Sequence, residues 1–234
     1  PVNYDPDKWM SAAAAAGFGY AVLTTRHHDG YALWPSEYGD FGVKQYLGGR
    51  DLVRPYVEAC RKNGLRVGFY YSPGNWLFHP PGWPWLRYPL RDREFLNRRP
   101  ERTAGKPRYA DHSIAQFQKH FEVLYAYVKG QVTELLTRYG KIDLLWWDGY
   151  DWPVGVDHHP EEMWAYVRKL QPDIVMNDRY MIWESGLLGG DYSTEYEGRG
   201  PYRRPDGPWE QSETMCGGMW SYAGPKAPCK TPQY

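Results

Sequence analysis

Short apolar segments alternate along the chain with longer segments in which apolar residues recur every three or four positions. Short continuous apolar runs are typical of strands buried on both faces, and the longer spacing is typical of amphipathic helices. The apolar runs predict strands over residues 20–25, 65–72, 142–148, 173–178 and, more weakly, 190–195. The helical spacing predicts helices over residues 5–16, 50–63, 113–140 and 160–170.

Residues at the ends of the predicted helices support these boundaries. Ser113 and Gln116 have the spacing of a capping box, in which each side chain accepts a hydrogen bond from the other residue's backbone N–H. Pro160 suits the first position of the last helix, where a missing N–H costs nothing. Gly17 stands where glycine commonly ends a helix. Residues 73–111, rich in proline, tryptophan and arginine, predict a long irregular segment of the kind that often carries function.

The alternation of strands and helices predicts an α/β fold with a parallel sheet and outer helices. An open doubly wound sheet and a closed (β/α)8 barrel share this pattern. Polar or aromatic residues follow nearly every predicted strand, at 26–29, 70–72, 146–148, 177–179 and 194–195. Strand ends that all contribute to one site are typical of a barrel enzyme, so we predict a TIM-like barrel. The sequence lacks a dinucleotide-binding fingerprint, a P-loop and a nucleophile elbow, and we expect no cofactor.

Charge and hydropathy exclude two classes of partner. The 28 basic and 28 acidic residues balance, which argues against nucleic acid. No apolar run approaches the roughly 18 to 20 residues of a membrane helix, so we expect no membrane partner. The cysteines lack zinc-site spacing, although a bridge between Cys216 and Cys229 is possible in an oxidising compartment.

The aromatic residues point to a ligand class. The chain has 12 Trp and 21 Tyr but only 7 Phe. Tryptophan and tyrosine combine an apolar ring with a polar group, which suits surfaces that are partly wet. Sugar rings have apolar faces and polar edges, so this composition favours a carbohydrate ligand.

Asp148 is the candidate with the clearest chemistry. It ends an apolar strand after two tryptophans, where a buried carboxylate needs a partner. It is either a nucleophile or base in an aromatic pocket, or a residue that caps the following turn. Glycoside hydrolysis requires two carboxyl groups, and Glu195 and Glu210 are the candidate partners.

Three basic side chains also follow strands. His27 and His28 are adjacent, and neighbours on a strand point to opposite faces, so we expect no metal bound by both. Past the strand end, where the chain can turn, both imidazoles could bond one sugar. Arg179 either forms a surface ion pair or donates to sugar hydroxyls or to Asp148.

Four segments resemble the family 29 glycoside hydrolases, the α-L-fucosidases. They are, in chain order, AVLTTRHHDGYALWPSEYGDF, RDLVRPYVEACRKNGLRVGFYYS, IDLLWWDG and NDR. The resemblance spans about residues 9–222. It implies a (β/α)8-like barrel with a β-sandwich, and hydrolysis of terminal α-L-fucose with retention of configuration. It also implies a fucosylated glycan as partner and a secreted, periplasmic or lysosomal location.

The resemblance implies roles position by position. Asp148 matches the nucleophile, Glu195 is the favoured acid/base, and Glu210 is its alternative. The expected substrate-binding residues are His27, His28, Trp34, Tyr71, Trp146 and Arg179. No metal is implied.

The chain also departs from the family pattern. The His-Trp-Gly motif of the family's first strand has no counterpart, and nothing after residue 222 resembles the last strands or the sandwich. About five strands are predicted where a closed barrel needs eight. We therefore expect residues 1–234 to form one partial barrel domain. Two other functions stay open, a non-catalytic fucose-binding relative and a retaining glycosidase for another 6-deoxy sugar.

Overall fold

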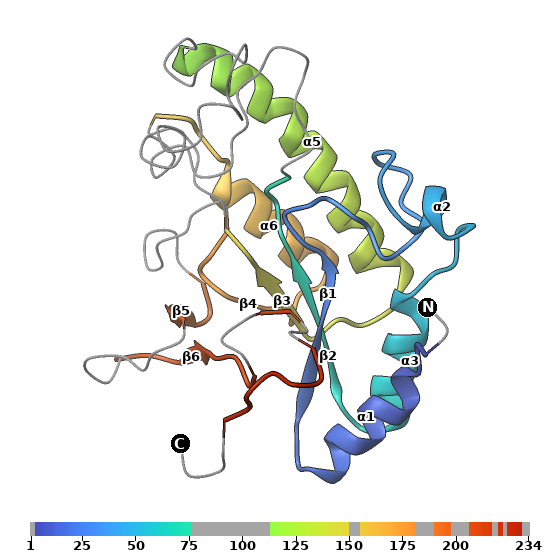
Figure 1. The fold of residues 1–234 in the computed structure, drawn as a ribbon. Helices are drawn as coiled ribbons and strands as arrows, with labels where there is room; N and C mark the ends of the chain where they lie inside the picture. The colour runs from blue at the N-terminus through green and yellow to red at the C-terminus, as the bar shows by residue number, and fades with distance from the viewer. Residues whose placement is uncertain are drawn as a thin grey trace.

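A computed structural model describes residues 3–75, 113–149, 155–180, 190–197, 206–216, 220–221 and 224–230. Most of the segment predicted to be irregular lies outside these ranges. Within them, the chain forms a four-stranded sheet in the order β1-β2-β3-β4 and a separate pair, β5-β6. All of these pairings are parallel. Figure 1 shows the four-stranded sheet with the long helix α5 running beside it.

The elements follow one another largely as predicted. In chain order they are α1 (Pro6–Ala15), β1 (Tyr20–Arg26), α2 (Val43–Tyr46), α3 (Val53–Lys62), β2 (Arg66–Tyr71), α5 (Ile114–Arg138), β3 (Leu144–Trp147), α6 (Pro160–Leu170), β4 (Val175–Met176), β5 (Ser193–Glu197) and β6 (Trp209–Ser212). The short helix α2 and the short polar strand β6 were not predicted. The neighbouring strands of the main sheet are also consecutive in the chain, as expected of parallel strands joined by crossover connections.

The predicted helix starts are present. Ser113 Oγ accepts from the Gln116 N–H at 3.3 Å, and Gln116 Oε1 accepts from the Ser113 N–H at 2.8 Å, which confirms the capping box of α5. Pro160 occupies the first turn of α6. Gly17 follows α1 with φ of +87°, a conformation that glycine adopts without steric cost.

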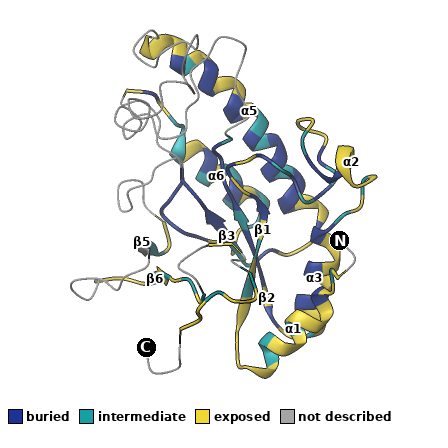
Figure 2. Ribbon diagram, in the orientation of Figure 1, coloured by how far each residue is buried: buried dark blue, intermediate teal, exposed yellow. Residues whose placement is uncertain are grey.

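The main sheet has one covered and one open face. Val67, Phe69 and Tyr71 of β2 are buried at 0–1% exposure and belong to the hydrophobic core with α3, α5 and α6. Successive residues of a strand point to opposite faces, so the residues between them face away from this core. Figure 2 shows the buried residues of α5 as a stripe along the helix. The core of the described residues therefore lies on the helix side of the sheet.

The opposite face of the sheet is open toward its amino-terminal end. There Tyr20, Val22 and Val175 are 38–46% exposed. A hollow of about 680 Å³ lies over this face, with Tyr20, Val175 and Glu210 among its lining residues. The four strands of the main sheet thus form a parallel sheet that does not by itself close a barrel.

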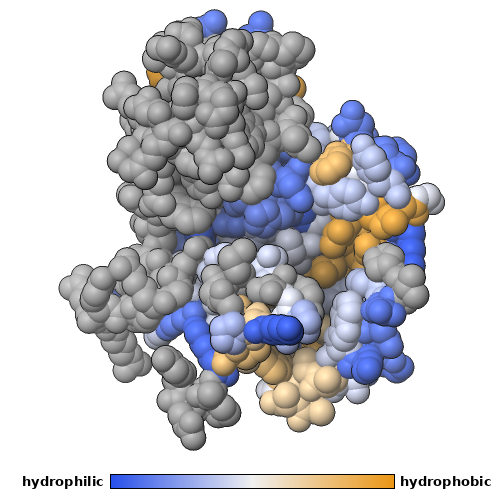
Figure 3. Space-filling view, in the orientation of Figure 1, coloured by the Kyte–Doolittle hydropathy of each residue, from blue (hydrophilic) through white to orange (hydrophobic). Residues whose placement is uncertain are grey.

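Three further features concern the described residues. Cys216 and Cys229 are disulfide-bonded, as the sequence allowed, and Cys60 is buried with a free thiol. None of the helices in the described ranges, the 25-residue α5 included, is apolar enough over a sufficient length to cross a membrane. In the view of Figure 3, hydrophobic surface gathers on the side where α1, α2 and α3 lie.

Candidate active site

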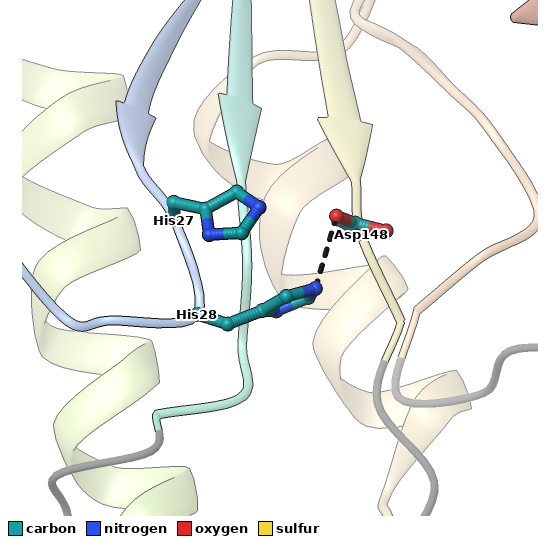
Figure 4. A group of neighbouring side chains, drawn as sticks. All are labelled: His27, His28 and Asp148. Atoms are coloured by element: carbon teal, nitrogen blue, oxygen red, sulfur yellow. Dashed lines mark ion pairs between the residues drawn. The ribbon is translucent and has the colours of Figure 1, made fainter. Parts of the chain in front are cut away.

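The carboxyl ends of the first three strands bring candidate residues together. Asp148 directly follows β3, and His27 and His28 directly follow β1. Figure 4 shows both imidazole rings extending from the end of β1 toward the Asp148 carboxylate. Tyr70 reaches the same point from β2, and Arg179 reaches it from the segment after β4. Parallel strands place such residues at one edge of the sheet.

Three side chains hold the Asp148 carboxylate. The Tyr70 hydroxyl donates to Oδ2, and His28 Nε2 lies 3.2 Å from the same oxygen. Arg179 Nη2 lies 3.3 Å from Oδ1. Burial by itself would raise the pKa of Asp148, but the hydrogen bond and charge of His28, the charge of Arg179 and the Tyr70 hydrogen bond outweigh it. The pKa therefore lies below its ordinary value, and the carboxylate is ionised at neutral pH.

The chain leaves β1 in a way that turns both histidines toward Asp148. The pairing of β1 with β2 shifts register between Thr24 and Arg26, an irregularity of the kind that re-aims side chains beside active sites. Gly30 then turns the chain with φ of +85°, and its N–H bonds the His27 carbonyl at 2.9 Å. A Cβ on Gly30 would lie 2.6 Å from Asn75 Oδ1, so only glycine fits. Past the strand end the chain thus turns, as the sequence allowed, and both imidazoles lie beside the Asp148 carboxylate.

Three aromatic rings from neighbouring strands form a stack at this edge. The Tyr70 ring lies parallel to His27 at 5.8 Å and to Trp146 at 5.3 Å. The Arg179 guanidinium lies 5.0 Å from the Trp146 ring centre, a cation–π contact. Burial lowers the pKa of His27, and the proximity of His28 lowers it further. The stack offers a flat, partly polar surface beside the carboxylate.

A second layer of polar residues fixes the strand ends. Ser72 Oγ contacts His28 Nδ1 and thereby orients that ring. Asn177 bonds both backbone groups of Trp147, accepting from its N–H at 2.8 Å and donating to its carbonyl at 2.9 Å. Asp178 Oδ1 accepts from the Thr194 N–H at 3.1 Å, which ties β5 to the end of β4. These bonds position the neighbours of Asp148 and of Glu195.

Two residues expected to bind substrate lie elsewhere. Tyr71 is fully buried on the helix side, where its hydroxyl accepts from Arg26 and donates to Gln131 at 2.9 Å. Its direction follows from strand alternation, because Tyr71 shares the face of Phe69. Trp34 is also fully buried, and its indole N–H donates to Glu134 at 2.8 Å. Both side chains belong to the core and not to the cluster around Asp148.

The two candidate acid/base residues lie on neighbouring strands. Glu195 is on β5 and Glu210 is on β6, and the two strands pair in parallel. The side chain of Glu195 lies outside the described atoms. Glu210 Oε1 accepts from the Trp146 indole N–H at 3.0 Å, which links it to the aromatic stack.

Tyr70, Ser72, Asn177 and Asp178 fall within the strand-end segments that the sequence predicted to contribute to one site, but none of them was assigned a role there. Strand alternation could have found Tyr70, because Val67 and Phe69 mark the buried face of β2 and Tyr70 falls on the other. The other three act through hydrogen bonds between segments distant in sequence, which no local pattern reveals.

The chain is similar to known proteins over nearly its whole length. The family model described as Alpha-L-fucosidase matches residues 1–233. Tissue alpha-L-fucosidase of Bos taurus is 31% identical over 229 residues, covering 94% of this chain and 41% of the relative. Putative alpha-L-fucosidase 1 of Oryza sativa subsp. japonica is 31% identical over 199 residues, covering 81% of this chain and 31% of the relative.

The solved structures that the chain resembles include alpha-L-fucosidases as well. Alpha-L-fucosidase isoenzyme 1 from Paenibacillus thiaminolyticus is 34% identical with a TM-score of 0.74, covering all of this chain and 53% of that one. A GH29 alpha-L-fucosidase of Bacteroides thetaiotaomicron, trapped as a covalent intermediate, is 25% identical with a TM-score of 0.73, covering 99% and 51%. The chain thus spans between about a third and a half of the length of these relatives.

Proposed function

The chain belongs to the α-L-fucosidase family, and we propose that it carries the nucleophile of a retaining glycoside hydrolase that releases terminal α-L-fucose from glycans. The observation that carries this proposal is the state of Asp148. Its carboxylate is buried, yet His28, Arg179 and Tyr70 keep its pKa below the ordinary value. A nucleophilic carboxylate must be ionised and held in place, and these contacts meet both requirements.

The proposed reaction is a double displacement. Asp148 attacks the anomeric carbon and displaces the aglycone oxygen, which takes a proton from a carboxylic acid. That second group, now a carboxylate, removes a proton from water, and the water oxygen replaces Asp148 at the same carbon. Both steps invert the anomeric centre, so the net result is retention. The relative trapped as a covalent intermediate supports this route.

We assign the acid/base role to Glu195 first and to Glu210 second. Glu195 matches the recurrent glutamate of the family segment, and Asp178 ties its strand to the site through Thr194. A separate observation favours Glu210, whose carboxylate bonds the indole of Trp146, two residues before the nucleophile.

The wider architecture is proposed on the same basis. The sheet β1 to β4 is one arc of a (β/α)8-like barrel, and further strands pack over its open face. A solved relative of about twice the length, with a TM-score of 0.74, supports this arrangement. The Cys216–Cys229 disulfide fits an oxidising compartment, such as a secreted, periplasmic or lysosomal location.

Hydrolysis of 4-nitrophenyl α-L-fucoside by the protein that carries this chain tests the proposal. Asp148→Asn keeps the side-chain shape but removes the nucleophile, and we expect kcat/KM to fall at least about 10³-fold. Asp7→Asn is a matched control, since within the described residues Asp7 forms exposed contacts with Lys62 and Asn63 at the end of α3, away from Asp148. Activity retained in Asp148→Asn would contradict the assignment.

The two alternative functions, a non-catalytic fucose-binding relative and a retaining glycosidase for another 6-deoxy sugar, predict different results in the same assay. A non-catalytic relative would bind L-fucose and release no 4-nitrophenol even as wild type. A glycosidase for another 6-deoxy sugar would hydrolyse the matching aryl glycoside faster than the fucoside. We expect the fucoside to be the preferred substrate.

A further inference from the structure

The side chains at the end of β1 and β3 also fit a second kind of ligand. His27, His28 and Asp148 each offer one donor atom, and these atoms all lie within 4.8 Å of one another. Two imidazole nitrogens and one carboxylate oxygen form a donor set that suits Zn²⁺, Cu²⁺ and Ni²⁺. We propose that this cluster binds a divalent transition-metal ion in place of the sugar, so that the ion inhibits the enzyme. The inhibition, but not the binding, rests on the proposed function.

The spacing of His28 and Asp148 already suits a shared ion. Two ligand atoms of a tetrahedral zinc ion, each about 2.0–2.2 Å from the metal, lie about 3.3–3.5 Å from each other. His28 Nε2 and Asp148 Oδ2 are 3.2 Å apart. An ion between these two atoms would take the place of the direct contact between the imidazole and the carboxylate. Neither side chain has to move far to accept it.

Ser72 determines which nitrogen of His28 faces Asp148. Ser72 Oγ contacts His28 Nδ1, and the Ser72 hydroxyl donates to the Gly74 carbonyl at 3.3 Å. The tautomer with its proton on Nδ1 suits this contact, and it presents the lone pair of Nε2 toward Asp148 and an ion. A hydrogen bond of this kind behind the ring orients most histidines that bind metals in proteins.

His27 supplies the third donor from the solvent side. It is exposed, whereas His28 and Asp148 are buried. The three donor atoms all lie within 4.8 Å of one another, so no pair exceeds the tetrahedral ligand spacing by more than about 1.4 Å. A modest rotation of the His27 ring would close this difference. An ion entering from solvent would thus meet His27 first, and water would occupy its fourth position.

Arg179 limits which ions can bind. Its guanidinium lies 3.3 Å from Asp148 Oδ1, which leaves Oδ2, the oxygen that also accepts from Tyr70, to face the ion, and a positive charge stands beside the site. Mg²⁺ and Ca²⁺ rely on several oxygen ligands, and here they would find one. Ions with affinity for imidazole gain two nitrogen ligands that offset the repulsion. We therefore expect binding of Zn²⁺ or Cu²⁺ and none of Mg²⁺ or Ca²⁺.

Calorimetric titration of the protein with ZnCl₂ tests the site without reference to activity. We expect one tight site per chain that is weakened at least about tenfold in His27→Gln and in Asp148→Asn. His159→Gln is the matched control, because His159 also contacts two carboxylates, Glu122 and Asp157, on a different part of the chain. Its Zn²⁺ affinity should equal that of the wild type.

Enzyme kinetics test the consequence of binding. We expect Zn²⁺ to raise the KM for 4-nitrophenyl α-L-fucoside with kcat unchanged, EDTA to reverse the effect, and MgCl₂ to have none. The site is overturned if Zn²⁺ does not bind, or if binding is lost in His159→Gln and kept in His27→Gln. If Zn²⁺ binds but does not inhibit an active enzyme competitively, the proposed inhibition is wrong. If the wild type hydrolyses no fucoside, the proposed function fails, while the titration still decides whether the metal site exists.

Discussion

Removal of one hydroxyl should shift the pH dependence of the reaction. Tyr70 donates to Asp148 Oδ2, and its ring stacks between His27 and Trp146. Tyr70→Phe keeps the ring and deletes the donor. Hydrogen bonds to charged groups contribute about 1.5–3 kcal/mol. One pKa unit corresponds to about 1.4 kcal/mol, so the pKa of Asp148 should rise by about 1 to 2 units.

The direction follows from the form of Asp148 that reacts. The carboxylate is the proposed nucleophile, and its ionised fraction falls as the pH drops through the pKa. A donor lost from the ionised form raises that pKa, so the acid limb of kcat/KM should move to higher pH by about 1 to 2 units. The profile is measured with 4-nitrophenyl α-L-fucoside, whose good leaving group needs little protonation.

The adjacent tyrosine provides a matched control. Tyr71 lies on the opposite face of β2, where its hydroxyl bonds Arg26 and Gln131 in the core. Tyr71→Phe should lower the free energy of unfolding by about 1–3 kcal/mol and leave the acid limb in place. If Tyr70→Phe leaves the acid limb where it was, or if Tyr71→Phe moves it as far, the Tyr70 hydroxyl does not control the ionisation of Asp148.

Three further changes separate the core from the site. Trp34→Phe removes the donor to buried Glu134, so thermal unfolding should show that the free energy of unfolding falls by about 1–3 kcal/mol. The KM for the fucoside should stay constant, and an increased KM would place Trp34 in the substrate site. Asn177→Ala breaks two buried bonds to Trp147 and should cost about 2–4 kcal/mol in urea denaturation. His158 has its pKa lowered to about 4, chiefly by burial, so the unfolded chain binds the extra proton and stability should fall by about 3 kcal/mol as pH drops from about 6.5 to 4. His158→Phe, which keeps the ring contact with Phe121, should flatten that slope in denaturation series across this range.

Much of the fold was predictable because the relevant signals are local. The capping box at Ser113 and the apolar run before Asp148 depend on neighbours in sequence, and both predicted elements are present. β6 was not predicted because its sequence, WEQS, is short and polar and has low strand propensity. Backbone pairing with β5 holds it in the strand conformation. Short polar strands such as β6 therefore form through pairing with distant segments and not through the propensity of their own residues.

The candidate site was predictable only where strand alternation was applied consistently. Trp146 and Asp148 share one side of β3, and the register pairs Trp146 with Tyr70 and Trp147 with Tyr71. Given that register, Tyr70 had to reach the carboxylate and Tyr71 had to enter the core. The two histidines break the same rule, because a shift of register before them and the turn at Gly30 redirect the chain.

The same contrast explains why one carboxylate of the proposed pair is better defined than the other. Asp148 follows the central strand β3, and its contacts come from β1, β2 and the end of β4, all belonging to one sheet. The glutamate candidates lie on the separate pair β5-β6, which Asp178 joins to the main sheet through Thr194. Because small shifts of that pair would change the distance from either glutamate to the substrate, the choice between Glu195 and Glu210 depends on how the pair is held against the main sheet. The position of Asp148, the proposed nucleophile, is therefore fixed by local strand register, whereas the positions of Glu195 and Glu210 depend on a pair of strands outside that sheet.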